Sequence, residues 1–231
     1  MKGFNQYKEE LNQNGFSIIE NIFDNVELNK ITKFIDCEKF NFSERQLLNR
    51  YPKIEEIIFN NQFFKELYNS ICDDSYFLSK AIYFNKPSKS NWFVSYHQDL
   101  SISVKNKLEA KGFISWTNKN EQLGVIPPLK VLENTITFRI HLDKAEITNG
   151  GLKVISNSHK KGIIRIDEKF NKSDFGNEIL CEVEKGGVML MKPLLLHSSS
   201  KSISENDRRV IHLEFCNQEI PMKWLEKRKI C

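Results

Sequence analysis

The sequence predicts a mainly β fold with flanking α-helices, with a jelly roll as the expected form. Before about residue 75 the pattern of apolar side chains is mainly helical, and from residue 76 to 220 it consists of short apolar or alternating runs bounded by Gly, Pro, Asn and Ser. Many short strands separated by turn residues are typical of sandwiches and barrels. We therefore expect a single domain over residues 1–231, with a helical flank at 1–75 and a jelly-roll core at 76–220.

The N-terminal flank carries recognisable helix signals. Residues 7–11 lead into Asn14-Gly15, where a helix is expected to end, and Asp24 is suited to cap the helix that begins after it. Residues 54–68 have apolar side chains near helical spacing, which predicts a further helix. Residues 16–20 read as a short strand between the first two helices.

The core contains the predicted strands. They are expected at 76–78, 81–84, 95–104, 135–142, 152–155, 188–191 and 209–215. The segment from 105 to 133 is long and irregular, and it contains Trp116 and the pair Pro127-Pro128. Long segments of this kind are typical of functional lids or disordered loops.

Composition and charge exclude several classes of protein. With 40% hydrophobic and 28% charged residues among its 231, the chain has the composition of a globular protein. A net charge of +4 is well short of a concentrated basic face, so no nucleic-acid partner is expected, and the basic residues at 223–229 are expected to form a solvated tail. No signal peptide and no apolar run of about 20 residues is visible, so we expect no membrane span and a cytoplasmic location.

The cysteines agree with a reducing compartment. Their number is odd, their spacings are wide, and no Cys-x-x-Cys occurs. They are Cys37, Cys72, Cys181, Cys216 and Cys231. Neither a disulfide framework nor a zinc–thiolate site is therefore indicated.

Two polar residues in the predicted strand 95–104 raise the question of a metal site. On a strand, residues i and i+2 point to the same side, so His97 and Asp99 can present a nitrogen and an oxygen to one point. Taken alone, such a pair is more often a solvated or cross-strand hydrogen-bonded pair. A third ligand decides between the two interpretations.

His197 is the best-placed third ligand, because it follows the apolar run 188–196 and precedes three serines. Two histidines and one aspartate make the facial triad of non-haem Fe(II) oxygenases, which leaves three adjacent coordination positions open. Zinc would accept the same ligands, so the triad alone does not name the metal.

An arginine could complete the site by binding the distal carboxylate of 2-oxoglutarate, because its planar guanidinium holds a carboxylate bidentately. Arg208 opens the strand that follows His197, and an antiparallel return would bring it near the metal. The neighbouring Arg209 is an alternative, since both faces of that strand are mixed. Either arginine could also be an ordinary surface residue.

At this point the sequence resembles the phytanoyl-CoA dioxygenase family of Fe(II)- and 2-oxoglutarate-dependent oxygenases. The matching motifs occur in the same order and cover nearly the whole chain. They are 14–23, 85–87 with 97–100, 139–143 with 149–155 and 158–160, and 186–188 with 195–199 and Arg208. One departure is Ser156-Asn157, where relatives often have Pro-Gly; Asn tolerates a left-handed turn, so the turn is expected to survive.

The resemblance implies a double-stranded β-helix, the cupin-like form of the jelly roll, and assigns roles to residues. It implies that His97, Asp99 and His197 bind Fe(II), and that Arg208 and the Ser199 hydroxyl bind 2-oxoglutarate. Arg139 and Ile82 are implied, less directly, to face the co-substrate. The retained Asp99 argues against a halogenase, in which a small residue stands at that position.

The implied reaction consumes 2-oxoglutarate and O₂, releases succinate and CO₂, and hydroxylates an aliphatic carbon of a small-molecule metabolite. Candidate substrate-binding residues are Trp92, Tyr96, Gln98 and Trp116, which could equally be packing residues. The mildly basic chain favours an anionic metabolite. Two alternatives stay open: a cupin-type metalloenzyme that does not use 2-oxoglutarate, and a non-catalytic jelly-roll binding module.

Overall fold

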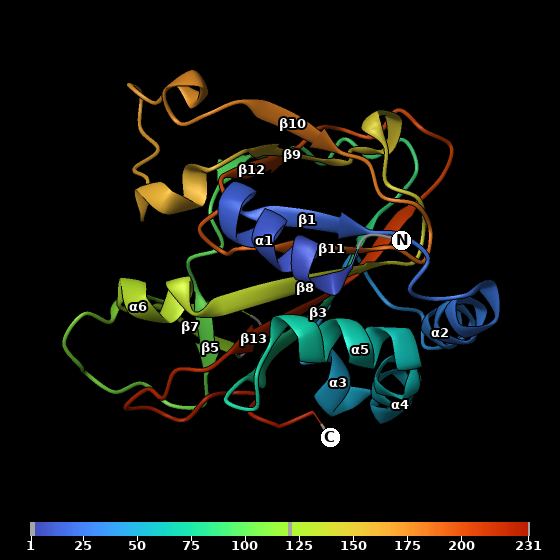
Figure 1. Cartoon of the computed structure of the whole chain (residues 1–231), viewed down its shortest axis with the longest axis horizontal. Coiled ribbons are helices and arrows are strands. Elements are labelled where there is room, and N and C mark those ends of the chain that lie inside the picture. Colours follow the sequence, from blue (N-terminus) through green and yellow to red (C-terminus); the bar gives the residue numbers. More distant parts are fainter. Residues whose placement is uncertain (1–2, 120–121, 231) are drawn as a thin grey trace.

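The fold is a jelly roll with helices on one side, as the sequence predicts (Figure 1). The computed structural model describes residues 3–119 and 122–230. A large antiparallel sheet has the strand order β1-β11-β8-β13-β3-β2, and a smaller one has the order β10-β9-β12-β4. In Figure 1 the smaller sheet is at the top and helices α3, α4 and α5 are at the bottom, with the large sheet between them.

The elements of the described chain have the following bounds. The helices are α1 (Phe4–Asn14), α2 (Asn25–Cys37), α3 (Leu47–Arg50), α4 (Pro52–Asn60), α5 (Gln62–Ile71) and α6 (Leu129–Glu133). The strands of the large sheet are β1 (Phe16–Ile19), β2 (Ser43–Arg45), β3 (Phe77–Lys86), β8 (Thr135–His141), β11 (Val188–Met191) and β13 (Arg208–Cys216). Those of the smaller sheet are β4 (Val94–His97), β9 (Leu152–Ile155), β10 (Glu178–Cys181) and β12 (His197–Ser199).

The local signals at the first two helices are confirmed. Helix α1 ends at Gly15, whose φ of 88° requires the left-handed conformation that glycine adopts without strain. Asp24 caps α2 in a capping box, in which its side chain accepts from the backbone N–H of Glu27 and the Glu27 carboxylate accepts in return. The turn at Asn157 also survives, with a φ of 68°.

The predicted helix at 54–68 is wrong as one element, because the chain breaks at Asn61 into α4 and α5. Asn61 has an extended backbone, and its side-chain oxygen accepts from the N–H of Phe64 at 2.7 Å. Its amide group donates to the Ile22 carbonyl at 3.0 Å and to the Glu27 carboxylate. Asn61 is therefore an N-cap that also links α5 to α2. These bonds stabilise a break in the chain at Asn61, although the spacing of the apolar residues fits one continuous helix.

The large sheet has two different faces, and the alternation of its side chains creates them. On β8 and β13, the side chains of Phe138, Ile140, Ile211 and Phe215 pack in the apolar core under the helices. The alternate positions carry polar and charged groups that point toward the smaller sheet. The sheet therefore has a helix face that supplies the core and a cavity face that supplies chemistry.

The predicted strands 76–78 and 81–84 are one strand, β3, because β13 pairs with it along its length with a register shift between Glu214 and Phe215. The predicted strand 95–104 is instead interrupted. Strand β4 ends at His97, and Asp99 lies on the connection to β5 (Ile102–Val104), where its backbone N–H donates to the Pro193 carbonyl at 2.9 Å.

The segment 105–133 is irregular only up to residue 113, and its later described residues are ordered into regular elements. It contains β6 (Ile114–Lys119), β7 (Gln122–Ile126) and α6, and the two strands join β5 in a three-stranded sheet of order β5-β7-β6. Antiparallel pairing provides hydrogen-bond partners for the backbone N–H and C=O groups, which in a long loop would bind water instead. The element is thus a third small sheet at the edge of the jelly roll.

The C-terminal residues do not form the solvated tail that the sequence suggested. Trp224 is buried and forms a bridge with Val104, and Arg228 forms one with Leu78. The Arg228 guanidinium also contacts Glu55 and Asn49. The side chains of Lys223, Lys227 and Lys229 are exposed, as predicted, but the segment that carries them is held against the core by buried apolar neighbours, which charge clustering alone does not reveal. Among the described helices, none is long and apolar enough to span a bilayer.

Substitution of Asn61 by Ala should lower the free energy of unfolding by about 2 kcal/mol, because it removes a helix cap and leaves a buried carbonyl without its donor. Urea unfolding followed by circular dichroism measures the effect. Gln62→Ala, at an exposed position one residue later, is the control and should change stability by under about 0.5 kcal/mol. Equal losses in both variants would contradict the assigned role of Asn61.

Candidate active site

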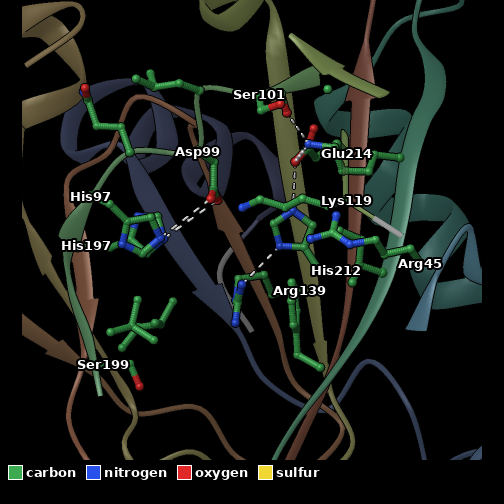
Figure 2. A pocket seen from close by; sticks show the side chains of 18 of the residues that line it. Arg45, His97, Asp99, Ser101, Lys119, Arg139, His197, Ser199, His212 and Glu214 are labelled. Atoms are coloured by element: carbon green, nitrogen blue, oxygen red, sulfur yellow. Dashed lines mark hydrogen bonds and ion pairs between the residues drawn. The ribbon is translucent and has the colours of Figure 1, made fainter. Parts of the chain in front are cut away.

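A cavity of about 520 Å³ lies between the cavity face of the large sheet, the smaller sheet and the third sheet. Its lining is unusually rich in charge. The charged side chains that line it are Arg45, Lys80, Lys86, Asp99, Lys119, Arg139, Arg208 and Glu214, together with the imidazoles of His97, His197 and His212. Figure 2 shows many of these side chains converging from different elements.

His97, Asp99 and His197 come together in this cavity. The pairing of β4 with β12 places His97 directly opposite His197, and their ring centroids are 4.2 Å apart. Each imidazole Nε2 lies 3.8 Å from an oxygen of Asp99, and the three ligand atoms lie within 4.8 Å of one another. Two ligands that are each about 2.1 Å from one ion can be at most about 4.2 Å apart, so the 3.8 Å separations allow a shared metal.

The hydrogen bonds of the two rings also fit metal binding. Nδ1 of His97 lies 2.9 Å from the Ser95 carbonyl, and Nδ1 of His197 lies 2.9 Å from the Leu195 carbonyl. A carbonyl only accepts, so each Nδ1 carries the proton and each Nε2 presents a lone pair toward Asp99. This tautomer is the one that binds a metal through Nε2.

Electrostatics keep the donor set in the form that metals bind. Burial lowers the pKa of His197 to about 4, so the ring is neutral near pH 7. Burial alone would raise the pKa of Asp99, but the imidazoles of His197, His212 and His97 lower it on balance, and the carboxylate is ionised. The neutral imidazole of His197 and the ionised carboxylate of Asp99, together with the imidazole of His97, make a donor set for a divalent transition metal.

A second cluster in the cavity surrounds Ser199. The Lys86 amine donates to the Ser199 hydroxyl and to the Ser200 carbonyl, each at 2.6 Å, and the Arg208 guanidinium lies 3.5 Å from the same hydroxyl. Gly150 leaves room for this arrangement, since a Cβ there would lie 2.5 Å from the Ser200 carbonyl oxygen. The Ser199 hydroxyl itself donates to the Gly150 carbonyl at 2.7 Å, so the cluster offers two cations to an anion, and the hydroxyl can join them by exchanging that bond.

The structure separates the roles of the two neighbouring arginines. Arg208 is buried on the cavity face, whereas Arg209 points to the other side and forms a bidentate ion pair with Asp143 at 2.8 and 2.9 Å. Asp143 raises the pKa of Arg209, while burial lowers the pKa of Arg208 to about 9. Only Arg208 is therefore available to a ligand in the cavity.

A chain of polar contacts crosses the cavity face of the large sheet. Arg139 donates to Nδ1 of His212 at 3.1 Å, and Nε2 of His212 lies 3.0 Å from the Glu214 carboxylate (Figure 2). The Lys80 amine binds the same carboxylate at 2.7 Å and the Ser101 carbonyl at 2.6 Å. Lys80 and Glu214 thus offset each other's desolvation, whereas Arg139 is bonded to an imidazole nitrogen and its buried Nε has no hydrogen-bond partner among the described residues.

Of the other site residues predicted from the sequence, some line the cavity and some do not. Ile82, Arg139, Trp92 and Gln98 line the cavity, although both ends of the Gln98 amide are already bonded to the backbone of Gly162, Ile164 and Leu194. That bonding indicates that Gln98 anchors the connection after β4.

Tyr96 and Trp116 lie outside the cavity lining. The Tyr96 hydroxyl contacts Glu178 and its ring packs near Phe170. Trp116 packs against the small apolar core behind the third sheet, with the Lys107 amine 5.7 Å from its ring centre.

Several cavity residues were not identified from the sequence. Lys80 and Lys86 share the cavity face of β3 with Ile82, and Glu214 lies on the same face of β13 as Arg208 and His212, the latter expected from its strand to be a core or pocket residue. Strand alternation could have revealed these three lining residues once Ile82 and Arg208 were placed. Arg45 and Lys119 carried no such signal, because they come from a short edge strand and from the segment read as irregular.

Comparisons with solved structures agree with this fold. The carbocyclase SnoK of nogalamycin biosynthesis, described as non-haem and α-ketoglutarate-dependent, is 11% identical with a TM-score of 0.65, covering 91% of this chain and 83% of its own. HygX from Streptomyces hygroscopicus, solved with nickel and 2-oxoglutarate, is 14% identical with a TM-score of 0.64, covering 91% and 85%. EctD from S. alaskensis, solved with bound Fe, is 14% identical with a TM-score of 0.70, covering 96% and 81%.

No curated protein sequence matches the chain. The sequence model of the phytanoyl-CoA dioxygenase family matches residues 11–210, a range that includes the triad and Arg208. The prediction of iron and 2-oxoglutarate as cofactors agrees with this match and with the donor set described above. The chain therefore belongs to the phytanoyl-CoA dioxygenase family.

Proposed function

We propose that the protein is an Fe(II)- and 2-oxoglutarate-dependent dioxygenase that hydroxylates an aliphatic carbon of a small-molecule metabolite. The observation that carries this proposal is the presence, in one cavity, of the His97–Asp99–His197 donor set and the Ser199 cluster with its two cations. A metal site and an anion seat together are what a chelating 2-oxo acid requires.

The iron, when bound, would supply the activation of O₂ that converts 2-oxoglutarate to succinate and CO₂ and replaces a C–H bond of the substrate by C–OH. One oxygen atom of O₂ enters succinate and the other enters the product, so the four-electron reduction of O₂ is balanced. The protein provides binding and orientation for this chemistry.

The residues of the chain have distinct tasks in this scheme. His97 and His197 hold the metal through Nε2, and their Nδ1–H bonds to backbone carbonyls fix the planes of the rings. Asp99 supplies the third ligand and a negative charge. Arg208, Lys86 and the Ser199 hydroxyl bind the distal carboxylate of 2-oxoglutarate, where charge-assisted hydrogen bonds are strong because the site is buried.

The retained carboxylate of Asp99, whose oxygens face both imidazoles, argues against halogenation and is consistent with hydroxylation. SnoK, with the same fold, is described as a carbocyclase, so the fold alone accommodates other outcomes. The cytoplasmic location stays a prediction; the cysteines Cys37, Cys72, Cys181 and Cys216 are free, which suits a reducing compartment.

Purified protein supplied with Fe(II), 2-oxoglutarate and O₂ should release succinate slowly without a primary substrate. Asp99→Asn and His97→Ala should reduce this release at least about 100-fold, since even the outer partners of metal ligands contribute roughly 10- to 100-fold. Succinate measured by mass spectrometry checks the result, with exposed Asp167→Asn as the matched control at full activity. Absence of both 2-oxoglutarate binding and succinate release in the wild type would favour the non-catalytic binding module.

Arg208→Ala should weaken 2-oxoglutarate binding about 100-fold, because a buried charged partner of the carboxylate is lost. Titration of 2-oxoglutarate into the anaerobic metal-loaded protein measures the affinity. Arg209→Ala is the matched control: it should lower stability through Asp143 and leave the affinity within about twofold. Unchanged affinity in a folded Arg208→Ala variant would favour a cupin-type enzyme that does not use 2-oxoglutarate at this position.

The affinity for 2-oxoglutarate should decrease above about pH 8. Burial, with a contribution from Arg208, lowers the pKa of Lys86 to about 8, so its ammonium group is charged below that pH and loses its proton above it. Above this pH one cation fewer is available to bind the dianionic 2-oxoglutarate, so the dissociation constant of 2-oxoglutarate rises by up to about tenfold per pH unit. Lys86→Met should bind more weakly and remove this dependence between about pH 7 and 8.5, whereas exposed Lys111→Met should retain it. A dependence that persists in Lys86→Met would contradict the assignment.

A further inference from the structure

The end of the cavity opposite Ser199 carries two cationic side chains that the proposed reaction does not use. Arg45 comes from β2 at the edge of the large sheet, and Lys119 comes from β6 of the third sheet. In Figure 2 both enter on the side away from Ser199 and extend toward His212 and the triad. Within the described residues, no carboxylate forms an ion pair with either of them.

Among the described residues that line the cavity, cationic side chains outnumber carboxylates, although Lys119 itself is exposed to solvent. Six cationic side chains line it, against the two carboxylates of Asp99 and Glu214. Glu214 is bound by Lys80 and His212, and Asp99 faces the imidazoles of the triad. A divalent metal and the dianionic co-substrate cancel each other in charge, so the loaded site keeps its positive excess. A site of this sign attracts anions and raises their local concentration.

The same end of the cavity is also polar in its uncharged groups. The side-chain oxygen of Gln122 is buried without a hydrogen-bond partner, while its amide nitrogen donates to Ser103 at 2.5 Å. A Cβ at Gly124 would lie 2.7 Å from the hydroxyl oxygens of both Ser101 and Thr117, so glycine lets these groups approach. A buried acceptor without a partner is costly unless a ligand or a water supplies a donor.

We propose that the primary substrate is a small polar acid whose carboxylate or phosphate group is bound by Arg45 and Lys119, opposite the Ser199 cluster, with a hydroxyl group donating to Gln122. This inference rests on the proposed dioxygenase function and names the class of its substrate. The guanidinium of Arg45 offers a planar pair of donors, and the Lys119 ammonium adds a mobile point charge. Anchoring the acid group at this end leaves the rest of a short molecule to face the metal.

Activity-guided fractionation can test the proposal before the substrate itself is identified. Small molecules below about 3 kDa from the source organism are separated on an anion exchanger at neutral pH, and each fraction is added to the iron-loaded protein with saturating 2-oxoglutarate. The stimulated rate of succinate release is divided by the rate without extract. We expect the retained, anionic fraction to stimulate. Stimulation by the unretained fraction, or by neither, would overturn the proposal.

Phosphatase treatment of the retained fraction distinguishes the two acid groups. Stimulation that is lost after treatment assigns a phosphate, and stimulation that survives assigns a carboxylate. Both results are consistent with the shared anionic chemistry, and each directs the next step of purification.

Variants test whether Arg45 and Lys119 are the residues that bind the acid. Arg45→Gln and Lys119→Gln should each need about tenfold more of the retained fraction for half-maximal stimulation, as for the loss of one charged hydrogen bond. Lys119→Arg should recover most of the response. Lys111→Gln, at an exposed position before β6, and Arg50→Gln, whose side chain pairs with Glu44 outside the cavity, are matched controls with wild-type responses. A wild-type response in both Arg45→Gln and Lys119→Gln would overturn the proposal.

Failure of this inference can be told apart from failure of the proposed function. Succinate release by the wild type without any extract reports the dioxygenase reaction alone. If that release is present while the anionic fraction does not stimulate, only the assignment of the substrate class fails. If release is absent, the dioxygenase function fails with it.

Discussion

The antiparallel pairing that sets His97 opposite His197 is the constraint on which the site depends. Strand β12 lies between β9 and β4, so its register is fixed from both sides, and a slip of one residue would turn each imidazole to the other face. Asp99 does not need a strand of its own. The chain leaves β4 after His97, Gln98 is held by three backbone groups, and the carboxylate is thereby placed between the two rings.

The large sheet buries charged side chains on one face and apolar side chains on the other. Its helix face is apolar and supplies most of the core, while its cavity face holds Lys80, Arg139, His212 and Glu214. Isolated buried charges would be costly, but here each contacts a group of complementary character across neighbouring strands. Apolar burial on the helix face therefore supplies much of the stability, and the other face is free to carry charge that a ligand can use. The β13 residues Arg208 and Arg209 show the division directly, since the first faces the cavity and the second pairs with Asp143.

Much of this architecture was predictable from the sequence because it depends on local patterns. The alternation of apolar and polar residues predicted strands β8 and β13, and the capping residue Asp24 predicted the start of α2. The order of the motifs along the chain indicated the family. The failures have physical causes of a different kind. The break at Asn61 depends on contacts with a distant helix, and the strands in 105–133 depend on pairing with β5. Local propensity contains neither contact, and it also gave no hint that Trp224 holds the C-terminal residues against the body of the protein.

The elements that sequence patterns missed are the ones that distinguish this cavity. The triad and the Ser199 cluster lie on the jelly-roll strands and their connections, which hold the metal-binding and anion-binding groups in a fixed register. Arg45, Lys119 and Gln122 come from an edge strand and from the third sheet, which is attached outside the two main sheets. Substitutions in such peripheral elements alter the wall of the cavity without disturbing the register of β4 and β12. A division of this kind lets one metal site serve different substrates, because the chemistry and the selectivity rest on separate strands.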